Sequence, residues 1–321
     1  MNITHLLPVR NGMKYLPQIE DSILCSVRTG DELIIVENGS IDGTADYLRD
    51  LEKLDSRIRV LNLLRGGLIE SLNLGLQEAS NDWIARCDID DQYCRERIES
   101  QTKLISERSV AVFSDALIID DYGNEISRVY SPIFPIATGV SLIRNRRTPH
   151  SSALINRHAA ISVGAYVKEH RFVEDLSLWL RLVRVGDLVS SPIPLMKYRI
   201  HGQSVTSASR KSMKEARRNL LSAIGLPKEI FKELEEKSTR HFLAKYENLS
   251  YPVERAISFV AERYLLQGCN VSARDGVLDE DFLAVISHFG LLQSIASAKN
   301  LIKNESRRIA ARRHSIVPTR S

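Results

Sequence analysis

The sequence predicts an α/β fold: a mostly parallel sheet flanked by helices, followed by a C-terminal helical extension. Four apolar runs occur in the first 115 residues, and none of them alternates with polar residues. Each run is followed by a segment whose apolar residues recur at helical spacing. Strands without polar alternation are typical of parallel sheets covered on both faces, and alternating strands and helices build such sheets.

The first part of the chain provides four strand–helix units. We expect strands over residues 3–8, 33–36, 58–64 and 83–87. We expect helices over residues 16–27, 44–54, 68–79 and 95–107, because their apolar residues recur every three or four positions. In the third of these helices, for example, Leu72, Leu76 and Ala79 share one stripe.

The pattern changes after residue 109. Strands are expected over residues 110–119 and 126–130, around a turn at 121–124, and over 152–155 and 195–200, with a helix over 176–185. Helical patterns then follow over residues 211–224, 228–246, 253–266, 279–289 and 291–313. We therefore expect a domain over residues 1–205, with halves of about 1–115 and 116–205, and a helical region over 206–321.

Composition and charge exclude several classes of protein. The 321 residues are 43% hydrophobic and carry a net charge of +4, which is typical neither of disordered chains nor of nucleic-acid-binding proteins. No apolar run reaches the roughly 18 residues that span a bilayer, and no basic segment followed by an apolar stretch near Met1 indicates secretion. The four cysteines are too scattered for a disulfide or zinc framework. We expect a cytoplasmic globular protein without a nucleic-acid partner.

Polar residues follow three of the predicted strands, at the edge where open α/β sheets bind ligands. They occupy residues 8–12, 37–44 and 86–91. Asp88 and Asp90 lie two positions apart at a strand end, so both carboxylates can reach one ligand. Oxygen donors of this kind suit Mg²⁺ or Mn²⁺. The alternative is a turn in which an aspartate caps the next helix.

The segment 37–44 argues against a dinucleotide-binding enzyme. It contains only Gly39 and Gly43, so it lacks the glycine spacing of the dinucleotide fingerprint, and a nicotinamide enzyme is disfavoured. Glu37 can instead contact hydrogen-bond donors on a nucleobase or ribose. The alternative is a simple turn whose polar residues cap the following helix.

Taken in order, these segments resemble glycosyltransferase family 2, whose members are inverting, nucleotide-sugar-dependent enzymes with the glycosyltransferase A fold. Residues 7–11 look like the family's Ile-Pro-Val-Tyr-Asn segment, with Arg10 in place of tyrosine. Glu37 and Asn38 stand where the family's next segment has two aspartates. Residues 84–91 are close to Ile-Ala-Arg-Met-Asp-Ala-Asp-Asp. The resemblance continues through residues 39–44, 65–76, 150–152, 163–166, 174–182 and 198–201, and it covers roughly residues 3–206.

The resemblance implies a set of site residues. Those expected around the nucleotide sugar are Pro8, Asn11, Glu37, Arg65, Asn73, Arg86 and Asp88. A divalent cation, Mn²⁺ or Mg²⁺, is expected on Asp90, and this cation would stabilise the charge on the leaving diphosphate. Asp88 is expected to contact the ribose or the cation. His201 resembles a family position that can approach the metal and supply a third ligand. The alternative for His201 is a surface-loop histidine.

Asp175, with Glu174 as its neighbour, is the expected catalytic base. In an inverting transfer the base lies on the face of the sugar opposite the leaving group, and this pair begins an apolar helix. Adjacent acids can raise one another's pKa, which helps a carboxylate accept a proton near neutral pH. The alternative is a structural pair, because acidic residues are favoured at helix N-termini in any protein.

The resemblance predicts a metal-dependent hexosyltransferase that takes a UDP-sugar as donor and a glycan or lipid-linked saccharide as acceptor, in the biosynthesis of a surface polysaccharide or lipopolysaccharide. Residues 299–321 carry seven lysines and arginines against only Glu305. A basic amphipathic helix over 291–313 predicts peripheral contact with the inner face of an anionic membrane. The alternative is a helix packed on the catalytic domain.

Two other classes of protein remain as alternatives. A nucleotidyltransferase also uses paired aspartates on an α/β sheet, but residues 8–12 do not supply its Gly-rich basic loop. A non-catalytic protein that binds carbohydrate or sugar nucleotides does not need a base. The joint presence of Asp88, Asp90 and Asp175 therefore favours an enzyme.

Overall fold

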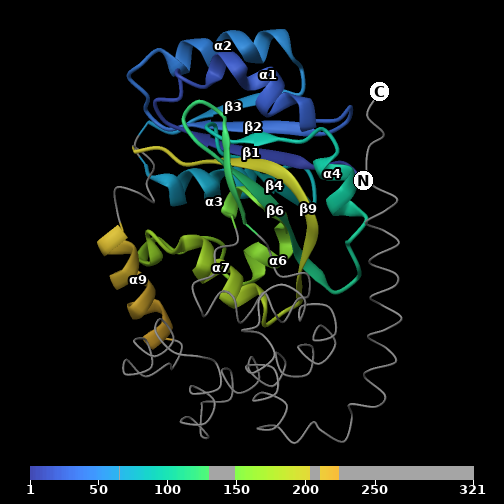
Figure 1. Ribbon diagram of the computed structural model, residues 1–321, viewed down its shortest axis with the longest axis vertical. Coiled ribbons are helices and arrows are strands. Elements are labelled where there is room, and N and C mark those ends of the chain that lie inside the picture. Colours follow the sequence, from blue (N-terminus) through green and yellow to red (C-terminus); the bar gives the residue numbers. More distant parts are fainter. Residues whose placement is uncertain (65, 130–148, 203–209, 224–321) are drawn as a thin grey trace, which may run out of the picture. The chain divides into compact units, whose positions relative to one another are not determined.

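The computed structural model describes residues 1–64, 66–129, 149–202 and 210–223. Almost all of them belong to one compact unit, residues 1–142 and 146–220. Its centre is a sheet that has nine strands within the described residues. Eight of these strands follow the order β3-β2-β1-β4-β8-β6-β9-β5, and β7 pairs with β6 alone (Figure 1).

The first four strands of the chain form the parallel half of the sheet, as the sequence predicts. They are β1 (Thr4–Val9), β2 (Glu32–Glu37), β3 (Ile58–Asn62) and β4 (Trp83–Arg86). Two helices connect them where helices are expected, α2 (Thr44–Leu54) and α3 (Leu68–Glu78). Because all four strands run the same way, their carboxyl ends meet at one edge of the sheet.

The two faces of the sheet bury alternate residues of each strand. On one face, Leu6 and Ile34 belong to a core cluster with side chains of α3, α6 and α7. On the other face, Leu7 and Ile35 pack in a second cluster with side chains of α1 and α2. Figure 1 shows α1 and α2 on one side of the sheet and α3, α6 and α7 on the other. The apolar runs of β1, β2 and β4 therefore correspond to strands that are buried on both faces, whereas the edge strand β3 is only partly buried.

The second half of the sheet is mixed. β8 (Leu154–Asn156) runs antiparallel to both β4 and β6 (Ser109–Ile119), and β9 (Asp187–Arg199) runs parallel to β6. β7 (Glu125–Val129) and β5 (Gln92–Tyr93) pair antiparallel with β6 and β9. The predicted parallel sheet is thus confirmed for the first four strands, and antiparallel pairs are added to it.

β9 is longer than the strand that the sequence predicts over 195–200. Pro192 and Pro194 lie within it, and proline interrupts the hydrogen-bond ladder of a strand. The register between β6 and β9 shifts on both sides of Asp115, which pairs with Pro194. These irregularities let the strand continue past two residues that normally argue against one.

The predicted helix over 16–27 is replaced by three short segments, η1 (Leu16–Gln18), α1 (Ile19–Ser22) and η2 (Leu24–Ser26). Ile23, between the last two, has φ −124° and ψ −54°, which is not a helical conformation. Leu16, Ile19, Ile23 and Val27 are nevertheless all buried. The pattern identified the correct inward face but not the break in the backbone.

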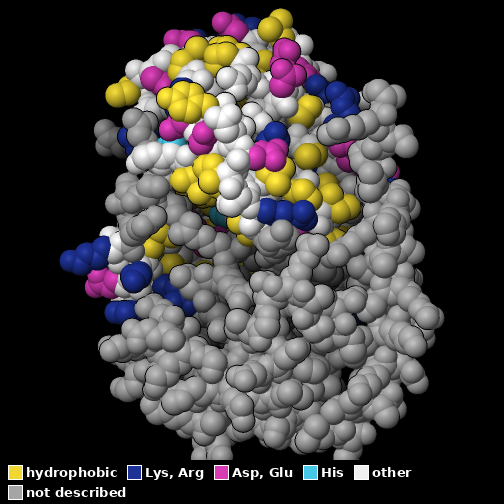
Figure 2. Space-filling view, in the orientation of Figure 1, with side chains coloured by type: hydrophobic (Ala, Val, Ile, Leu, Met, Phe, Trp, Pro, Cys, Tyr) yellow, Lys and Arg dark blue, Asp and Glu magenta, His cyan; other side chains and the backbone are white. Residues whose placement is uncertain are grey.

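The remaining described helices follow β4 in the chain. They are α4 (Arg97–Thr102), η3 (His150–Ser152), α6 (Arg157–Ser162), η4 (Lys168–His170), α7 (Glu174–Leu182) and α9 (Arg210–Ala223). α9 matches the predicted helix over 211–224, and its exposed side chains include Lys211, Lys214 and Arg218. Figure 2 shows basic side chains gathered on this helix.

The helices expected after residue 224 and the basic segment 299–321 lie outside the described residues. The boundary near residue 205 stays a prediction. Within the part of the chain that is described, no helix combines the length and the apolar character needed to cross a membrane.

Candidate active site

Three carboxylates converge in the turn after β4, which we call the acidic turn (residues 88–91). One ligand oxygen from each of Asp88, Asp90 and Asp91 lies within 4.8 Å of the others. The side chains of Asp88 and Asp90 are 30% and 24% exposed, whereas Asp91 is buried. Clustered hard oxygen donors with partial access to solvent fit a divalent cation such as Mg²⁺ or Mn²⁺.

Asp88 is fixed from two sides. Its carboxylate forms an ion pair with the buried guanidinium of Arg86, the last residue of β4. Its backbone N–H donates to the Tyr93 hydroxyl over 2.7 Å. Burial raises the pKa of Asp88, the positive charge of Arg86 opposes this rise, and the negative charge of Asp90 adds to it. The sequence gives no signal for Tyr93, because β5 is only two residues long.

Asp91 anchors the acidic turn to the protein. One carboxylate oxygen accepts a hydrogen bond from Ser151 Oγ at 2.5 Å, and the other accepts one from the backbone N–H of Arg199 at 2.9 Å. Burial, and then the charges of Asp88 and Asp90, raise its pKa well above the ordinary value. Because both oxygens of Asp91 already have protein partners, Asp88 and Asp90 are the more accessible ligands for a cation.

His201, the third predicted metal ligand, lies beside Asp90. Its Nε2 is 2.9 Å from an Asp90 carboxylate oxygen, although the two residues are 111 positions apart in the chain. The Tyr15 ring packs near the imidazole, with the ring centroids 6.1 Å apart. The fold therefore brings together two of the predicted metal ligands.

The loops that follow β1 and β2 are tied to each other at the same edge. The side-chain oxygen of Asn11 accepts a hydrogen bond from the backbone N–H of Ile41 at 3.0 Å. The backbone N–H of Asn11 donates to Ser40 Oγ at 2.8 Å. Both oxygens of Glu37 accept from backbone amides of its own loop, those of Ser40 at 2.6 Å and Gly39 at 3.2 Å. Glu37 thus shapes the loop, and its contact with a nucleobase stays a prediction.

The other expected nucleotide-sugar residues have different settings. Pro8 lies within β1 opposite Val36. Asn73, on α3, makes paired hydrogen bonds to the backbone of Tyr166 at 2.8 and 3.0 Å. Arg65 lies outside the described residues. Their contacts with a nucleotide sugar stay predictions.

Glu174 and Asp175, the predicted base and its neighbour, begin α7. Asp175 accepts a hydrogen bond from the backbone N–H of Leu176 at 2.7 Å. Burial and, after it, the negative charge of Asp175 raise the pKa of Glu174 to about 7, while Arg86 opposes the rise. A carboxyl whose pKa is raised to near neutral pH by burial and a neighbouring acid is typical of acid–base sites.

The Tyr166 hydroxyl is close enough to both the acidic pair and the acidic turn for their charges to affect its pKa. Burial raises the pKa of the Tyr166 hydroxyl; the positive charge of Arg86 opposes the rise, and the negative charges of Asp175, Glu174 and Asp88 add to it. The hydroxyl itself lies 2.8 Å from Nε2 of the partly buried His150. The sequence included both residues in the motif resemblance without assigning them a role.

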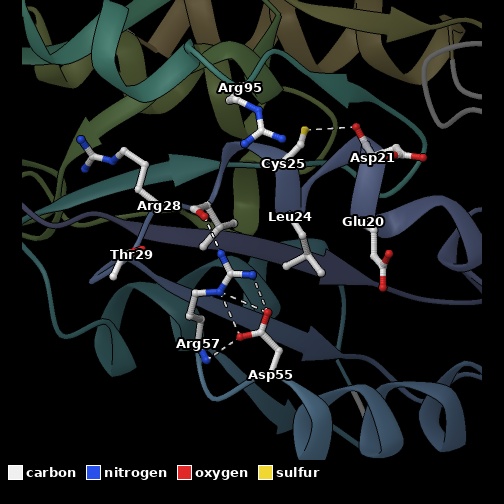
Figure 3. Close-up of a pocket in the computed structure, with 10 residues that line it drawn as sticks. Glu20, Asp21, Leu24, Cys25, Arg28, Thr29, Asp55, Arg57 and Arg95 are labelled. Atoms are coloured by element: carbon white, nitrogen blue, oxygen red, sulfur yellow. Dashed lines mark hydrogen bonds and ion pairs between the residues drawn. The ribbon is translucent and has the colours of Figure 1, made fainter.

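A separate hollow of about 540 Å³ lies near the amino ends of β2 and β3 (Figure 3). Its lining includes Arg57 and Asp55, whose side chains are paired with each other. Arg28, also in the lining, is paired with Asp31. The acidic turn is instead at the carboxyl end of β4, where open sheets bind their ligands.

The profile of Glycosyl transferase family 2 matches residues 5–166, just over half of the chain. The chain belongs to glycosyltransferase family 2. The putative teichuronic acid biosynthesis glycosyltransferase TuaG of Bacillus subtilis is 26% identical over 217 residues, covering 66% of this chain and 84% of TuaG. This glycosyltransferase is therefore similar in sequence to a relative named for polysaccharide biosynthesis.

Solved structures share the fold of this glycosyltransferase. S. aureus TarS in complex with UDP-GlcNAc aligns with a TM-score of 0.58 and 14% identity, covering 96% of this chain and 92% of that one. The mannosyltransferase PcManGT from Pyrobaculum calidifontis, in complex with GDP-Man and Mn²⁺, aligns with a TM-score of 0.52 and 13% identity, covering 92% and 86%. The expected glycosyltransferase A fold is confirmed.

Proposed function

We propose that this glycosyltransferase is an inverting, divalent-cation-dependent enzyme that moves a sugar from a UDP-sugar to a hydroxyl of a glycan or lipid-linked saccharide in surface polysaccharide biosynthesis. The observation that carries the proposal is the contact of His201 with Asp90. Asp90 belongs to the acidic turn, which lies at the carboxyl end of the parallel strands. The UDP-GlcNAc complex of TarS and the name of TuaG support the choice of donor and pathway.

The donor end of the site would consist of Asp90, Asp88 and His201. A bound cation supplies neutralisation of the charge that develops on the leaving diphosphate. Arg86 holds the Asp88 carboxylate, and Asp91 holds the turn in place through Ser151. These contacts preorganise the oxygens, so that little rearrangement is needed when the nucleotide sugar binds.

The residues around the nucleotide would be Pro8, Asn11, Glu37, Arg65 and Asn73. The hydrogen bonds between Asn11 and the loop after β2 support a rigid cradle at this edge. The Glu37 carboxylate supports the same loop by accepting hydrogen bonds from its backbone N–H groups.

The acceptor end of the site would use Asp175 as general base. An ionised Asp175 removes the proton from the acceptor hydroxyl as that oxygen attacks the anomeric carbon from the face opposite the diphosphate. Glu174 keeps its proton up to a pH of about 7, so the pair carries one negative charge rather than two. A protonated Glu174 repels the electron-rich acceptor oxygen less than an ionised Glu174 does.

A donor panel tests the proposal. UDP-sugars are incubated with Mn²⁺, with and without EDTA, and slow donor hydrolysis and UDP binding are measured for the wild type and Asp90→Ala. Asp46→Ala is the matched control, because Asp46 is an exposed acid on α2. We expect EDTA-sensitive UDP binding that only Asp90→Ala abolishes. Failure of every UDP-sugar to bind with any metal would contradict the proposed donor.

A further inference from the structure

Arg199, the last residue of β9, links three segments around the acidic turn. Its backbone N–H donates to the carboxylate of Asp91 at 2.9 Å. Its Nε donates to the backbone carbonyl of Asp90 at 2.9 Å. Its Nη1 donates to the carbonyls of Asp120 and Asp121, in the turn between β6 and β7, at 2.8 and 3.2 Å. The residue is 5% exposed, so these bonds are shielded from solvent.

Arg199 also stands two residues before His201. The main chain of Asp90 is held by the Arg199 side chain, and the carboxylate of Asp90 meets His201 at 2.9 Å. These contacts form a closed ring that runs through the end of β9 and the acidic turn. Tyr15 covers it, with its ring 5.8 Å from the Arg199 guanidinium and 6.1 Å from the His201 ring.

A guanidinium group suits this position better than an ammonium group. Its N–H groups point in fixed directions in one plane, so one side chain can bond carbonyl groups of two separate turns at once. A lysine at the same position has a flexible stem and a single nitrogen. It can retain the charge and one of the carbonyl contacts, but not the rigid link between the two turns.

We propose that Arg199 is a positioning residue that sets the separation of Asp90 and His201 and thereby the affinity of the site for its divalent cation. The inference rests on the proposed metal site. Side chains that orient metal ligands typically contribute a factor of about 10 to 100 in metal affinity. Arg199 contacts the backbone of one ligand and is joined through two peptide bonds to the other, so the same magnitude is expected here.

The test measures Mn²⁺ binding directly. Free Mn²⁺ is followed by its electron paramagnetic resonance signal during titration of the full chain in the presence of UDP, for the wild type, Arg199→Met and Arg199→Lys. Arg57→Met is the matched control, because the Arg57 side chain also donates to a backbone carbonyl, that of Val27, but lies near the amino ends of the strands. Thermal unfolding of each variant establishes that it is folded.

We expect the Kd for Mn²⁺ to rise about 10- to 100-fold in Arg199→Met, to rise less in Arg199→Lys, and to stay within twofold in Arg57→Met. A folded Arg199→Met with the wild-type Kd overturns the inference, as does an equal loss in Arg57→Met. If Arg199→Met does not fold, Arg199→Lys decides by the same criterion. A wild type that binds no Mn²⁺ contradicts the proposed metal site itself and removes the inference with it.

Discussion

Replacing Glu174 by glutamine should stabilise the protein, and the gain should grow with pH. The pKa of this carboxyl is raised from 4.5 to about 7 by burial and by the charge of Asp175. At ~1.4 kcal/mol per pH unit, this difference corresponds to ~3 kcal/mol of folding free energy lost once the group is ionised in the folded protein. Glu174→Gln removes that loss because the amide never ionises.

The sign follows from proton binding in the two states. Between pH 4.5 and about 7 the folded protein holds the Glu174 proton and the unfolded chain does not, so the free energy of unfolding falls as pH rises. We expect Glu174→Gln to gain less than ~1 kcal/mol at pH 5 and ~2–3 kcal/mol at pH 8, since partial exposure of Glu174 reduces the full value. Urea unfolding of both proteins at the two pH values measures this.

The matched control is Glu107→Gln, which removes an exposed carboxyl and should change stability by similar small amounts at both pH values. Equal gains for Glu174→Gln at pH 5 and pH 8 would refute the reasoning, because the effect would then not be ionisation. A loss of stability at pH 8 would refute it as well, and would indicate that the carboxylate makes favourable contacts that burial does not outweigh.

Three further predictions follow from the same contacts. Asp175→Asn should reduce sugar transfer about 10²- to 10⁴-fold in a product assay, with UDP binding within twofold of wild type, and near-normal transfer would remove Asp175 as base. Tyr93→Phe leaves the Asp88 amide without its partner and should lower the free energy of unfolding in urea by ~1–3 kcal/mol; an unchanged value would contradict this. Burial lowers the pKa of both His5 and His150, so each imidazole should take up its proton only below pH 6.5 in the folded protein. NMR titration of the two imidazoles checks the last point, and a pKa at or above 6.5 for either one would count against it.

The sequence alone determined the fold class and the first half of the sheet. β1 to β4 and the helices α2 and α3 were predictable because their signal is local: apolar residues repeat with the period of the structure that buries them. The proximity of Asp88 and Asp90 to the edge of the sheet was also predictable, because the end of a strand determines where the residues after it lie.

The tertiary structure decided how the site is held. Tyr93, Ser151 and Arg199 support the acidic turn, yet no periodicity marks them, and the contact between Arg199 and Asp90 joins residues 109 positions apart. The first part of β9, before the predicted strand over 195–200, was also hidden, because Pro192 and Pro194 interrupt its pattern. Periodicity records which face of an element is buried, whereas a hydrogen bond between distant residues depends on how the elements pack. Only the folded chain brings such donors and acceptors within reach of one another.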